Sequence, residues 1–302
     1  MSVPAQTLTL RSAALLLVPP LLWAGNAIVG RMVHDMIPPM TLNFVRWLLA
    51  GLLLLPFTYP ILRRRSPLWS HWKRYAVLAL LGVGCYNSFQ YLALQTSTPI
   101  NVTLVASSSP VFMLGIGALF FKQTIRKRQI IGAVLSIFGV LLVLSRGDWQ
   151  ALMNVQLVVG DVFVLMATAA WAGYSWLLTQ TSEPTEVRND WANFLMAQIT
   201  LGFVWSGLFT AGEWAITDAH ILWGWPLAAA LAYVAIGPAI LAYRCWGLGV
   251  QQAGPNIAGF FSNLTPLFAA LLSALTLGEL PTWYHMAAFA CIVGGIVVSS
   301  RR

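Results

Sequence analysis

Ten stretches of predominantly apolar residues follow one another along the chain, and each is about long enough to cross a bilayer as a helix. A transmembrane helix needs about 20 mostly apolar residues, and only short polar connections separate these stretches. They cover residues 13–31, 38–60, 75–95, 99–121, 129–146, 160–180, 193–212, 226–246, 254–278 and 284–300. Strands of a membrane barrel alternate polar and apolar residues, which the run Leu48–Leu55 does not. The pattern therefore predicts an all-α membrane protein with ten transmembrane helices.

The composition agrees with this prediction. Of the 302 residues 58% are hydrophobic and only 9% are charged, and the mean hydropathy is +0.74. Soluble proteins carry about 25% charged residues, so the surplus of apolar side chains has to face lipid. The three cysteines (Cys85, Cys245 and Cys291) lie singly inside apolar stretches, without C-x-x-C spacing. We interpret them as small packing residues and expect no metal or other cofactor.

The net charge of +8 reflects membrane topology and not binding to nucleic acid. Lysines and arginines gather between the second and third stretches, between the fourth and fifth, and at the end of the chain. With ten spans these places lie on the same side of the membrane as the N-terminus, and the positive-inside rule makes that side cytoplasmic. We therefore expect a multi-pass protein of a bacterial inner membrane with both termini in the cytoplasm. The basic residues in question are Arg63, Arg64, Arg65, Lys73, Arg74, Lys122, Arg126, Lys127, Arg128, Arg301 and Arg302.

The two halves of the chain, residues 13–146 and 160–300, repeat each other. A shift of 156 positions places Pro99 on Pro255 and Pro110 on Pro266, and a shift of 148 places Trp23 on Trp171, each followed by Ala-Gly. Because each half holds five spans, the second half enters the membrane from the opposite side. Such inverted repeats recur in secondary transporters, whose solute site lies near the middle of the bilayer between the repeats.

Polar and aromatic side chains within the spans are candidates for a solute pathway, because lipid disfavours them. Residues three or four positions apart share one helical face, as do Trp23 and Asn26. Serine and asparagine also stand beside prolines inside the fourth and ninth spans, where a proline removes a backbone hydrogen bond and frees a carbonyl. The predicted substrate-binding residues are Trp23, Asn26, Tyr86, Asn87, Gln90, Ser108, Trp171, Tyr174, Tyr243 and Asn263.

Other roles stay open for several of these side chains. Tyr243 and Trp246 can belong to the aromatic belt at the membrane surface, and a serine can bond back to the preceding helical turn. Arg46 is the deepest charged residue, and it can snorkel, pair with other groups or attract an anion. No Asp or Glu lies deep within a span, and proton-coupled carriers usually place one there. We therefore expect a facilitator or an exchanger.

Several motifs together resemble the EamA-type drug/metabolite transporter superfamily and, within it, the YddG-type exporters of aromatic and other amino acids. These motifs are Trp23-Ala24-Gly25-Asn26, Pro39 with Arg46, Ser-x-Pro110, Thr265-Pro266, Gly249–Pro255 and Leu277-Gly278-Glu279. The resemblance implies two five-helix EamA repeats around a cavity lined by spans 1, 3, 4, 6, 8 and 9, with spans 5 and 10 at the periphery. It also implies efflux of amino acids or related metabolites. Gln123 stands where many members carry the acidic residue that Glu279 supplies in the second half.

The sequence thus predicts a transporter, not an enzyme, that exports amino acids or related small metabolites by alternating access. Its partners would be a small-molecule substrate and membrane lipid, with the chain acting as a monomer or homodimer. A multidrug or quaternary-cation exporter is the alternative, although the small four-helix carriers of that kind need a Glu in their first helix, where Asn26 is the polar residue here. A phosphate or nucleotide-sugar carrier would need several basic residues in the cavity, and a membrane enzyme would need a catalytic cluster.

Overall fold

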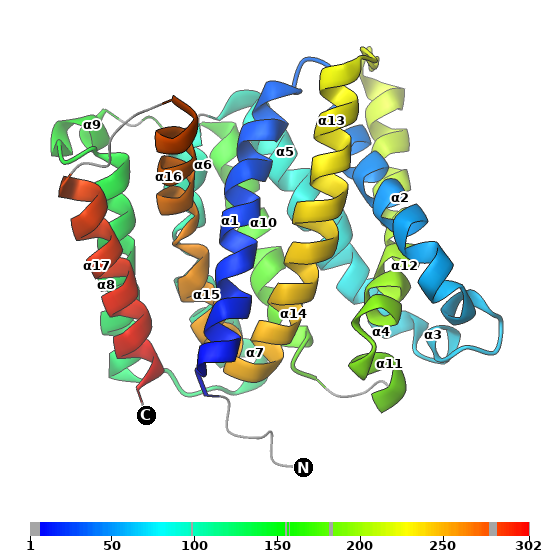
Figure 1. Ribbon diagram of the computed structural model, residues 1–302, viewed down its shortest axis with the longest axis horizontal. Coiled ribbons are helices and arrows are strands. Elements are labelled where there is room, and N and C mark those ends of the chain that lie inside the picture. The colour runs from blue at the N-terminus through cyan, green and yellow to red at the C-terminus, as the bar shows by residue number, and fades with distance from the viewer. Residues whose placement is uncertain are drawn as a thin grey trace.

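The regular structure of the chain is entirely helical wherever it is described. The computed structural model describes residues 7–97, 99–154, 156, 158–180, 184–277 and 283–301. Most helices stand side by side in one bundle, and α1 begins and α17 ends at the same end of it (Figure 1). We call this the termini end. Glu279 and Arg302, both used in the sequence analysis, lie outside the described residues.

The first half contains five spans, two of which consist of more than one helical piece. The third span begins as α4, passes through the π-helical segment η2 and continues as α5, and the fourth span consists of α6 and α7. A 3₁₀ segment η1 and the short helices α3 and α9 lie in the connections. The bounds are α1 Leu10–Met32, α2 Pro39–Thr58, η1 Tyr59–Leu62, α3 Pro67–Ser70, α4 Trp72–Ala79, η2 Leu80–Cys85, α5 Tyr86–Thr96, α6 Pro99–Ala106, α7 Ser109–Phe121, α8 Lys127–Leu144 and α9 Trp149–Met153.

The second half repeats this arrangement. Its third span is again divided by a π-helical segment, η3, and its fourth span again consists of two helices, α15 and α16. The bounds are α10 Val159–Leu177, α11 Thr185–Asn189, α12 Trp191–Ile216, α13 Trp225–Val234, η3 Ala235–Leu241, α14 Ala242–Ala253, α15 Pro255–Ser262, α16 Thr265–Leu277 and α17 Trp283–Ser300.

The ten predicted apolar stretches correspond to ten helical segments. Eight of these, within the described residues, are long and apolar enough by themselves to cross a membrane. The other two are α10 and the pair α15–α16. Helix α10 carries Asp161, Trp171 and Tyr174, which lower its hydropathy. Both of these exceptions are helices that contribute polar residues to the site described below.

The breaks in the helices occur at matching positions of the two repeats. A shift of 156 positions carries η2 onto residues 236–241 of η3, and it carries the gap between α6 and α7 onto the gap between α15 and α16. Helix packing is symmetric too, because α1 lies against α14 as α10 lies against α5, while α2 pairs with α12 and α8 with α17. The fold is therefore two five-helix repeats related by an approximate two-fold axis.

Small residues bring α8 and α17 into close contact at one edge of the bundle (Figure 1). A Cβ atom added to Gly132 would lie 2.7 Å from the backbone oxygen of Gly295, and one added to Gly139 would lie 2.8 Å from that of Ala288. Small residues in helices permit such close approach of two backbones in a membrane. The helix faces that carry these glycines are covered by the contact between α8 and α17. They are therefore not available for contact with a second copy of the chain.

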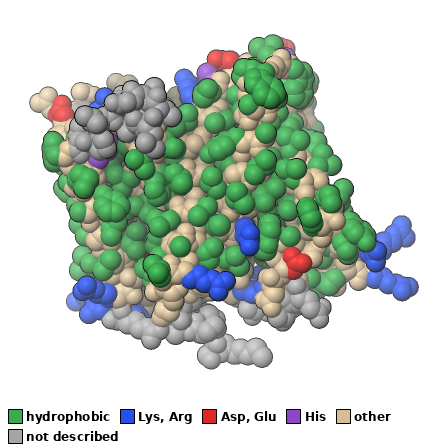
Figure 2. Space-filling model, viewed as in Figure 1, with side chains coloured by type: hydrophobic (Ala, Val, Ile, Leu, Met, Phe, Trp, Pro, Cys, Tyr) green, Lys and Arg blue, Asp and Glu red, His purple; other side chains and the backbone are tan. Residues whose placement is uncertain are grey.

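The exterior has the surface of a membrane protein. Apolar side chains cover the middle of the molecule, and lysines and arginines lie along its termini end (Figure 2). Several tryptophans near the ends of the helices are exposed, among them Trp69 at 42% and Trp225 at 83%. Trp246, for which a place in the belt was left open, is fully buried instead.

Candidate functional site

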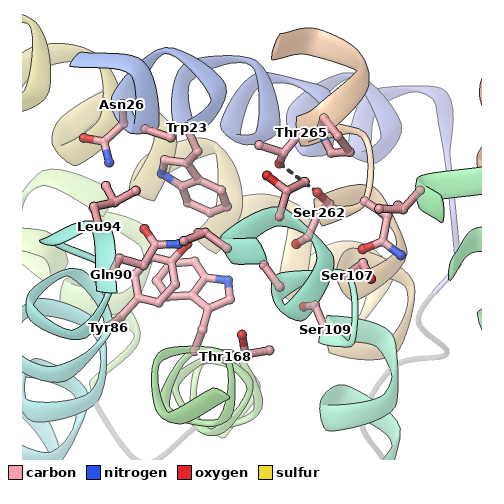
Figure 3. Close-up of a pocket in the computed structure, with 18 of the residues that line it drawn as sticks. Trp23, Asn26, Tyr86, Gln90, Leu94, Ser107, Ser109, Thr168, Ser262 and Thr265 are labelled. Atoms are coloured by element: carbon pink, nitrogen blue, oxygen red, sulfur yellow. Dashed lines mark hydrogen bonds between the residues drawn. The ribbon is translucent and has the colours of Figure 1, made fainter. Parts of the chain in front are cut away.

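A cavity of about 840 Å³ of empty space, part of it open, lies between the two repeats. Helices α1, α5, α6, α7 and α10 and the break between α15 and α16 enclose it (Figure 3). We call it the main cavity. Within the described residues its lining contains no charged side chain. The lining residues are Trp23, Asn26, Ala27, Tyr86, Gln90, Tyr91, Leu94, Val102, Thr103, Ala106, Ser107, Ser109, Val140, Thr168, Trp171, Ser262, Asn263, Thr265 and Pro266.

Helical periodicity places the first group of these side chains. Trp23 and Asn26 lie one turn apart on α1, and Tyr86 and Gln90 lie one turn apart on α5, so each pair presents a single face to the cavity. In Figure 3 Asn26, Gln90 and Tyr86 stand together at one end of the cavity. This end combines two amide groups with an aromatic ring.

The broken helices supply the other polar end of the cavity. Ser107 lies in the gap between α6 and α7 and Ser109 begins α7, while Ser262 and Thr265 flank the gap between α15 and α16 (Figure 3). Ser107 donates to the carbonyl of Leu104 at 2.6 Å, and Thr265 donates to that of Ser262 at 2.7 Å. Irregular backbone in a membrane is tolerated where it lines a cavity and neighbouring groups satisfy it, which is the case here.

Three buried polar atoms of the cavity lining have no hydrogen-bond partner among the described residues. They are Nε1 of Trp171, Oγ of Ser262 and Oδ1 of Asn263. The amide of Asn263 is only 2% exposed, and its Nδ2 donates to Oγ of Ser136 at 2.9 Å. Buried polar groups are nearly always satisfied, and the exceptions need an explanation. A polar solute in the cavity would supply the missing partners.

An aromatic cluster closes the main cavity toward the termini end. Its core is Trp171, whose ring stacks on Tyr86 with centroids 4.3 Å apart and meets Trp23 edge-on at 5.1 Å. Trp23 and Trp171 are repeat partners, so this contact lies close to the approximate two-fold axis. The cluster consists of Trp23, Tyr86, Trp171, Tyr174, Tyr243 and Trp246. Rings packed at such distances leave no passage for a solute.

A second, smaller cavity lies beyond the aromatic cluster at the termini end. About 360 Å³ of empty space, part of it open, lies there between helices α10, α11, α12 and α14, and Tyr174, Tyr243 and Arg244 are among its lining residues. The aromatic cluster therefore separates two spaces that approach it from opposite sides. This is the arrangement expected of a pathway that is closed at one barrier.

The fourth and ninth spans show which side is closed. Their termini-end halves, α7 and α15, pack on each other, and a Cβ atom on Gly259 would lie 2.6 Å from Cγ of Met113. The other halves, α6 and α16, make no comparable contact among the described residues. The main cavity lies between these separated halves, so it extends away from the termini end.

A hydrogen-bonded network runs behind the wall of the main cavity. Arg46 on α2 donates from Nη1 to Oδ1 of Asn87 at 2.7 Å and to the hydroxyl of Tyr91 at 3.1 Å. Tyr91 in turn donates to Oδ1 of Asn26 at 2.8 Å, and Asn87 donates to the hydroxyl of Tyr243 at 2.9 Å. The network ties α1, α2, α5 and α14 together. Arg46 is fully buried, so it pairs inside the bundle and does not snorkel.

The structure brings six of the ten predicted site residues into the main cavity: Trp23, Asn26, Tyr86, Gln90, Trp171 and Asn263. Tyr174 and Tyr243 lie in the aromatic cluster and line the second cavity. Asn87 points into the network around Arg46, because it is adjacent to the cavity residue Tyr86 and neighbouring helical residues are about 100° apart. Ser108 lines neither cavity, and its hydroxyl donates to the carbonyl of Val105 at 2.6 Å.

Several residues of the cavity were not among the predicted ones. Tyr91 had a signal in the sequence, because it follows Asn87 by four positions and so shares the face that meets Arg46. The two prolines Pro110 and Pro266 drew attention to the hydroxyl residues just before them, but only the structure shows which of these face the cavity. They are Ser107, Ser109, Ser262 and Thr265. Thr168 precedes Trp171 by three positions on α10.

Comparison with known proteins assigns the family. The model of the EamA-like transporter family matches the chain twice, over residues 10–145 and over residues 158–301. The chain belongs to the EamA-like transporter family. The resemblance inferred from the sequence motifs is therefore confirmed, and this EamA-like protein is a multi-pass membrane transporter and not a member of an enzyme family.

Relatives of this EamA-like chain include named exporters. It is 25% identical over 299 residues to a probable amino-acid metabolite efflux pump of Salmonella typhimurium, covering 95% of this chain and 93% of the relative. It is 24% identical over 241 residues to the aromatic amino acid exporter YddG of Ancylobacter novellus, covering 80% of this chain and 78% of the relative. An uncharacterized inner membrane transporter of Escherichia coli, YedA, is 25% identical over 280 residues, covering 92% and 87%.

A solved crystal structure has the same fold as this EamA-like chain. The two structures superpose with a TM-score of 0.70, at 19% identity and with 95% of each chain covered. The arrangement of two five-helix repeats is therefore one already found in a crystal.

Proposed function

We propose that this EamA-like transporter exports amino acids, aromatic and other hydrophobic or neutral ones, or related small metabolites by alternating access. The main cavity is the proposed substrate site. The observation that carries the proposal is its lining, in which the aromatic rings of Trp23, Tyr86 and Trp171 face amide and hydroxyl groups of both repeats, with unsatisfied polar atoms among them. Such a cavity suits a small solute that is apolar at one place and polar at two others.

Each part of the lining has a role in this proposal. Trp and Tyr rings offer apolar contact area for a side chain and can hold an ammonium group by cation–π contact. Asn26 and Gln90 provide hydrogen-bond donors for a carboxylate, and the unpaired oxygens of Ser262 and Asn263 can accept from an ammonium group. The ten predicted site residues stay candidates, with Ser108 having the least support from its position.

The relatives support the direction and the place of transport. One is named an aromatic amino acid exporter and another a probable amino-acid metabolite efflux pump, and YedA is named an inner membrane transporter. We place this protein in a bacterial inner membrane with its termini end in the cytoplasm, because the basic side chains gather at that end (Figure 2). In this orientation the main cavity extends toward the outside. Transport as a facilitator or exchanger fits the uncharged lining.

Counterflow in proteoliposomes tests the proposal. Purified protein is reconstituted with unlabelled amino acid inside, and uptake of the radiolabelled amino acid is followed without a pH gradient. We expect transient, saturable accumulation of phenylalanine, tryptophan or leucine, and loss of it when excess unlabelled substrate is added outside. Absence of accumulation across aromatic and aliphatic amino acids would overturn amino acids as the substrates. Uphill uptake driven by a pH gradient would overturn the facilitator or exchanger mechanism alone.

An exporter of quaternary cations is the second candidate, and one observation favours it. Stacked aromatic rings such as Tyr86 on Trp171 also recognise quaternary ammonium groups. The same liposomes loaded with tetraphenylphosphonium separate the two candidates, because a cation exporter would show counterflow of this probe and not of amino acids.

A further inference from the structure

Arg46 is a buried positive charge that no carboxylate neutralises among the described residues. Its side chain is 0% exposed, and its Nε and Nη2 have no hydrogen-bond partner there. Its guanidinium lies 5.3 Å from the centroid of the Trp47 ring. The ion pair of His34 with Asp35 lies at the end of the bundle opposite the termini and does not involve Arg46. Burial of an unpaired charge is costly in a membrane, so its retention needs a reason.

The acidic groups packed against the neighbouring helices are engaged elsewhere. Glu213 of α12 accepts from the backbone N–H groups of Met40 and Thr41 at 2.9 Å, at the N-terminus of the same helix that carries Arg46. Asp161 of α10 accepts from Ser97 and, at 3.1 Å, from Asn101. Neither carboxylate forms an ion pair with the guanidinium within the described residues.

The guanidinium stands one side chain behind the wall of the main cavity. Nη1 donates to the Tyr91 hydroxyl, which donates to Asn26, and both Tyr91 and Asn26 line the cavity. In a medium of low dielectric constant a charge acts strongly over such a separation. The hydrogen bonds also polarise each other in the same direction. The end of the cavity formed by Asn26, Tyr91 and Gln90 is therefore electropositive, although it carries no charged residue of its own.

We propose that Arg46 determines the electrostatic selectivity of the main cavity, so that it accepts solutes with a carboxylate group and rejects solutes whose only charge is positive. This rests on the proposed function in that the main cavity is taken as the transport site. The carboxylate lies at the end formed by Asn26 and Gln90. The ammonium group of a zwitterion then lies toward the aromatic rings and the unpaired oxygens of Ser262 and Asn263.

Three probes of matched shape test this selectivity by calorimetric titration of the purified protein. L-Phenylalanine has both charged groups, 3-phenylpropionate has the carboxylate alone, and phenethylamine has the ammonium group alone. We expect the wild-type protein to bind the two carboxylates more tightly than the amine. Arg46→Gln lowers the affinity ratio of phenylpropionate to phenethylamine roughly tenfold or more, because one full charge is lost in a low-dielectric site. Arg46→Lys keeps the order of the three probes, because the charge stays.

Arg11→Gln is the matched control, because it removes the same charge from an exposed position of α1; it leaves the ratio unchanged. Circular dichroism and gel filtration establish that each variant is folded. The proposal is overturned if a folded Arg46→Gln variant keeps the affinity ratio of phenylpropionate to phenethylamine. It is also overturned if the variant loses affinity equally for all three probes. If Arg46→Gln does not fold, the affinities of the wild-type protein for the three probes test the proposal. Binding of the amine that is equal to or tighter than binding of the carboxylates contradicts an electropositive cavity.

The failure of this inference differs from the failure of the proposed function. If amino acids show counterflow but the affinity ratio does not depend on Arg46, the proposed export function is supported and the proposed role of Arg46 is wrong. Binding of phenylpropionate that depends on Arg46, without counterflow of any amino acid, keeps the role of Arg46 and points to organic anions as the substrates.

Discussion

Two glutamines of α5 have the same side chain in opposite environments. Gln90 is half-buried and lines the main cavity, whereas Gln95, little more than one turn further, is exposed on the outside. Replacing Gln90 by Leu keeps the approximate size and removes the amide. One net hydrogen bond contributes about 0.5–1.5 kcal/mol, so we expect the half-saturation concentration for counterflow of an amino acid to rise roughly threefold to tenfold.

Gln95→Leu is the control for this prediction. It removes the same amide from the same helix, and we expect its transport to equal that of the wild-type protein. Equal transport by both variants, at equal amounts of reconstituted protein, would show that Gln90 does not contact the substrate.

The sequence could predict cavity residues where helical periodicity alone decided their direction. Trp23 with Asn26 and Tyr86 with Gln90 share a face at spacings of three and four, and each pair reaches the cavity. Asn87 was included with the second pair because it is adjacent in sequence. It faces Arg46 instead, since an adjacent residue points about 100° away and a buried guanidinium needs acceptors. That need was not visible before α2 and α5 were placed side by side.

At the scale of elements, the close packing of helices α8 and α17 leads to a prediction about stability. A methyl group on Gly132 would meet the backbone oxygen of Gly295 at 2.7 Å and Cβ of Ser299 at 3.0 Å, so Gly132→Ala has to push the helices apart. Overpacking of this kind costs about 1–3 kcal/mol. We expect a lower midpoint of thermal unfolding in detergent. Substrate affinity stays close to that of the wild-type protein, because α8 contributes only Val140 to the main cavity and α17 contributes no described residue.

Gly115→Ala on α7 provides the comparison for Gly132→Ala. Nothing lies within 4 Å of a Cβ atom added there, so the new methyl group meets no obstacle. Alanine in an unstrained helical position stabilises by about 0.4–1 kcal/mol relative to glycine, and we expect an equal or higher midpoint. A midpoint of Gly132→Ala at or above that of the wild-type protein would contradict the tight contact between α8 and α17.

The sequence could predict the number and approximate limits of the helical segments, but not their internal breaks. Apolar length is a local property, and it located all ten segments. The π-helical segments Leu80–Cys85 and Ala235–Leu241 carry no such local signal, and of the two only the second contains a proline. Their occurrence at matching positions of the repeat shows that the bundle around them determines them. The gaps before Pro110 and Pro266 were signalled by proline, because it cannot donate a helical hydrogen bond.

At the scale of the whole molecule, the approximate two-fold symmetry is broken at one place that matters for transport. Helices α7 and α15 pack together at the termini end, whereas their repeat counterparts α16 and α6 do not form the equivalent contact in the described residues. Inverted repeats can exchange such contacts, which opens the site alternately to each side. Under the proposed alternating access, the state described here is one member of a pair, and the other member requires α7 and α15 to separate.

A reversible cross-link between α7 and α15 tests this requirement. Cβ of Met113 would lie 3.2 Å from a Cβ atom on Gly259, close to the spacing of about 3.5–4.5 Å found in disulfides. In a background without the native Cys85, Cys245 and Cys291, we expect oxidation of the double variant Met113→Cys and Gly259→Cys to abolish counterflow, and a reductant to restore it. Calorimetric binding of the substrate persists in the oxidised protein, because the main cavity stays open on the other side. Each single variant is insensitive to oxidant, and full counterflow through the cross-linked protein would mean that solutes pass without separation of α7 from α15.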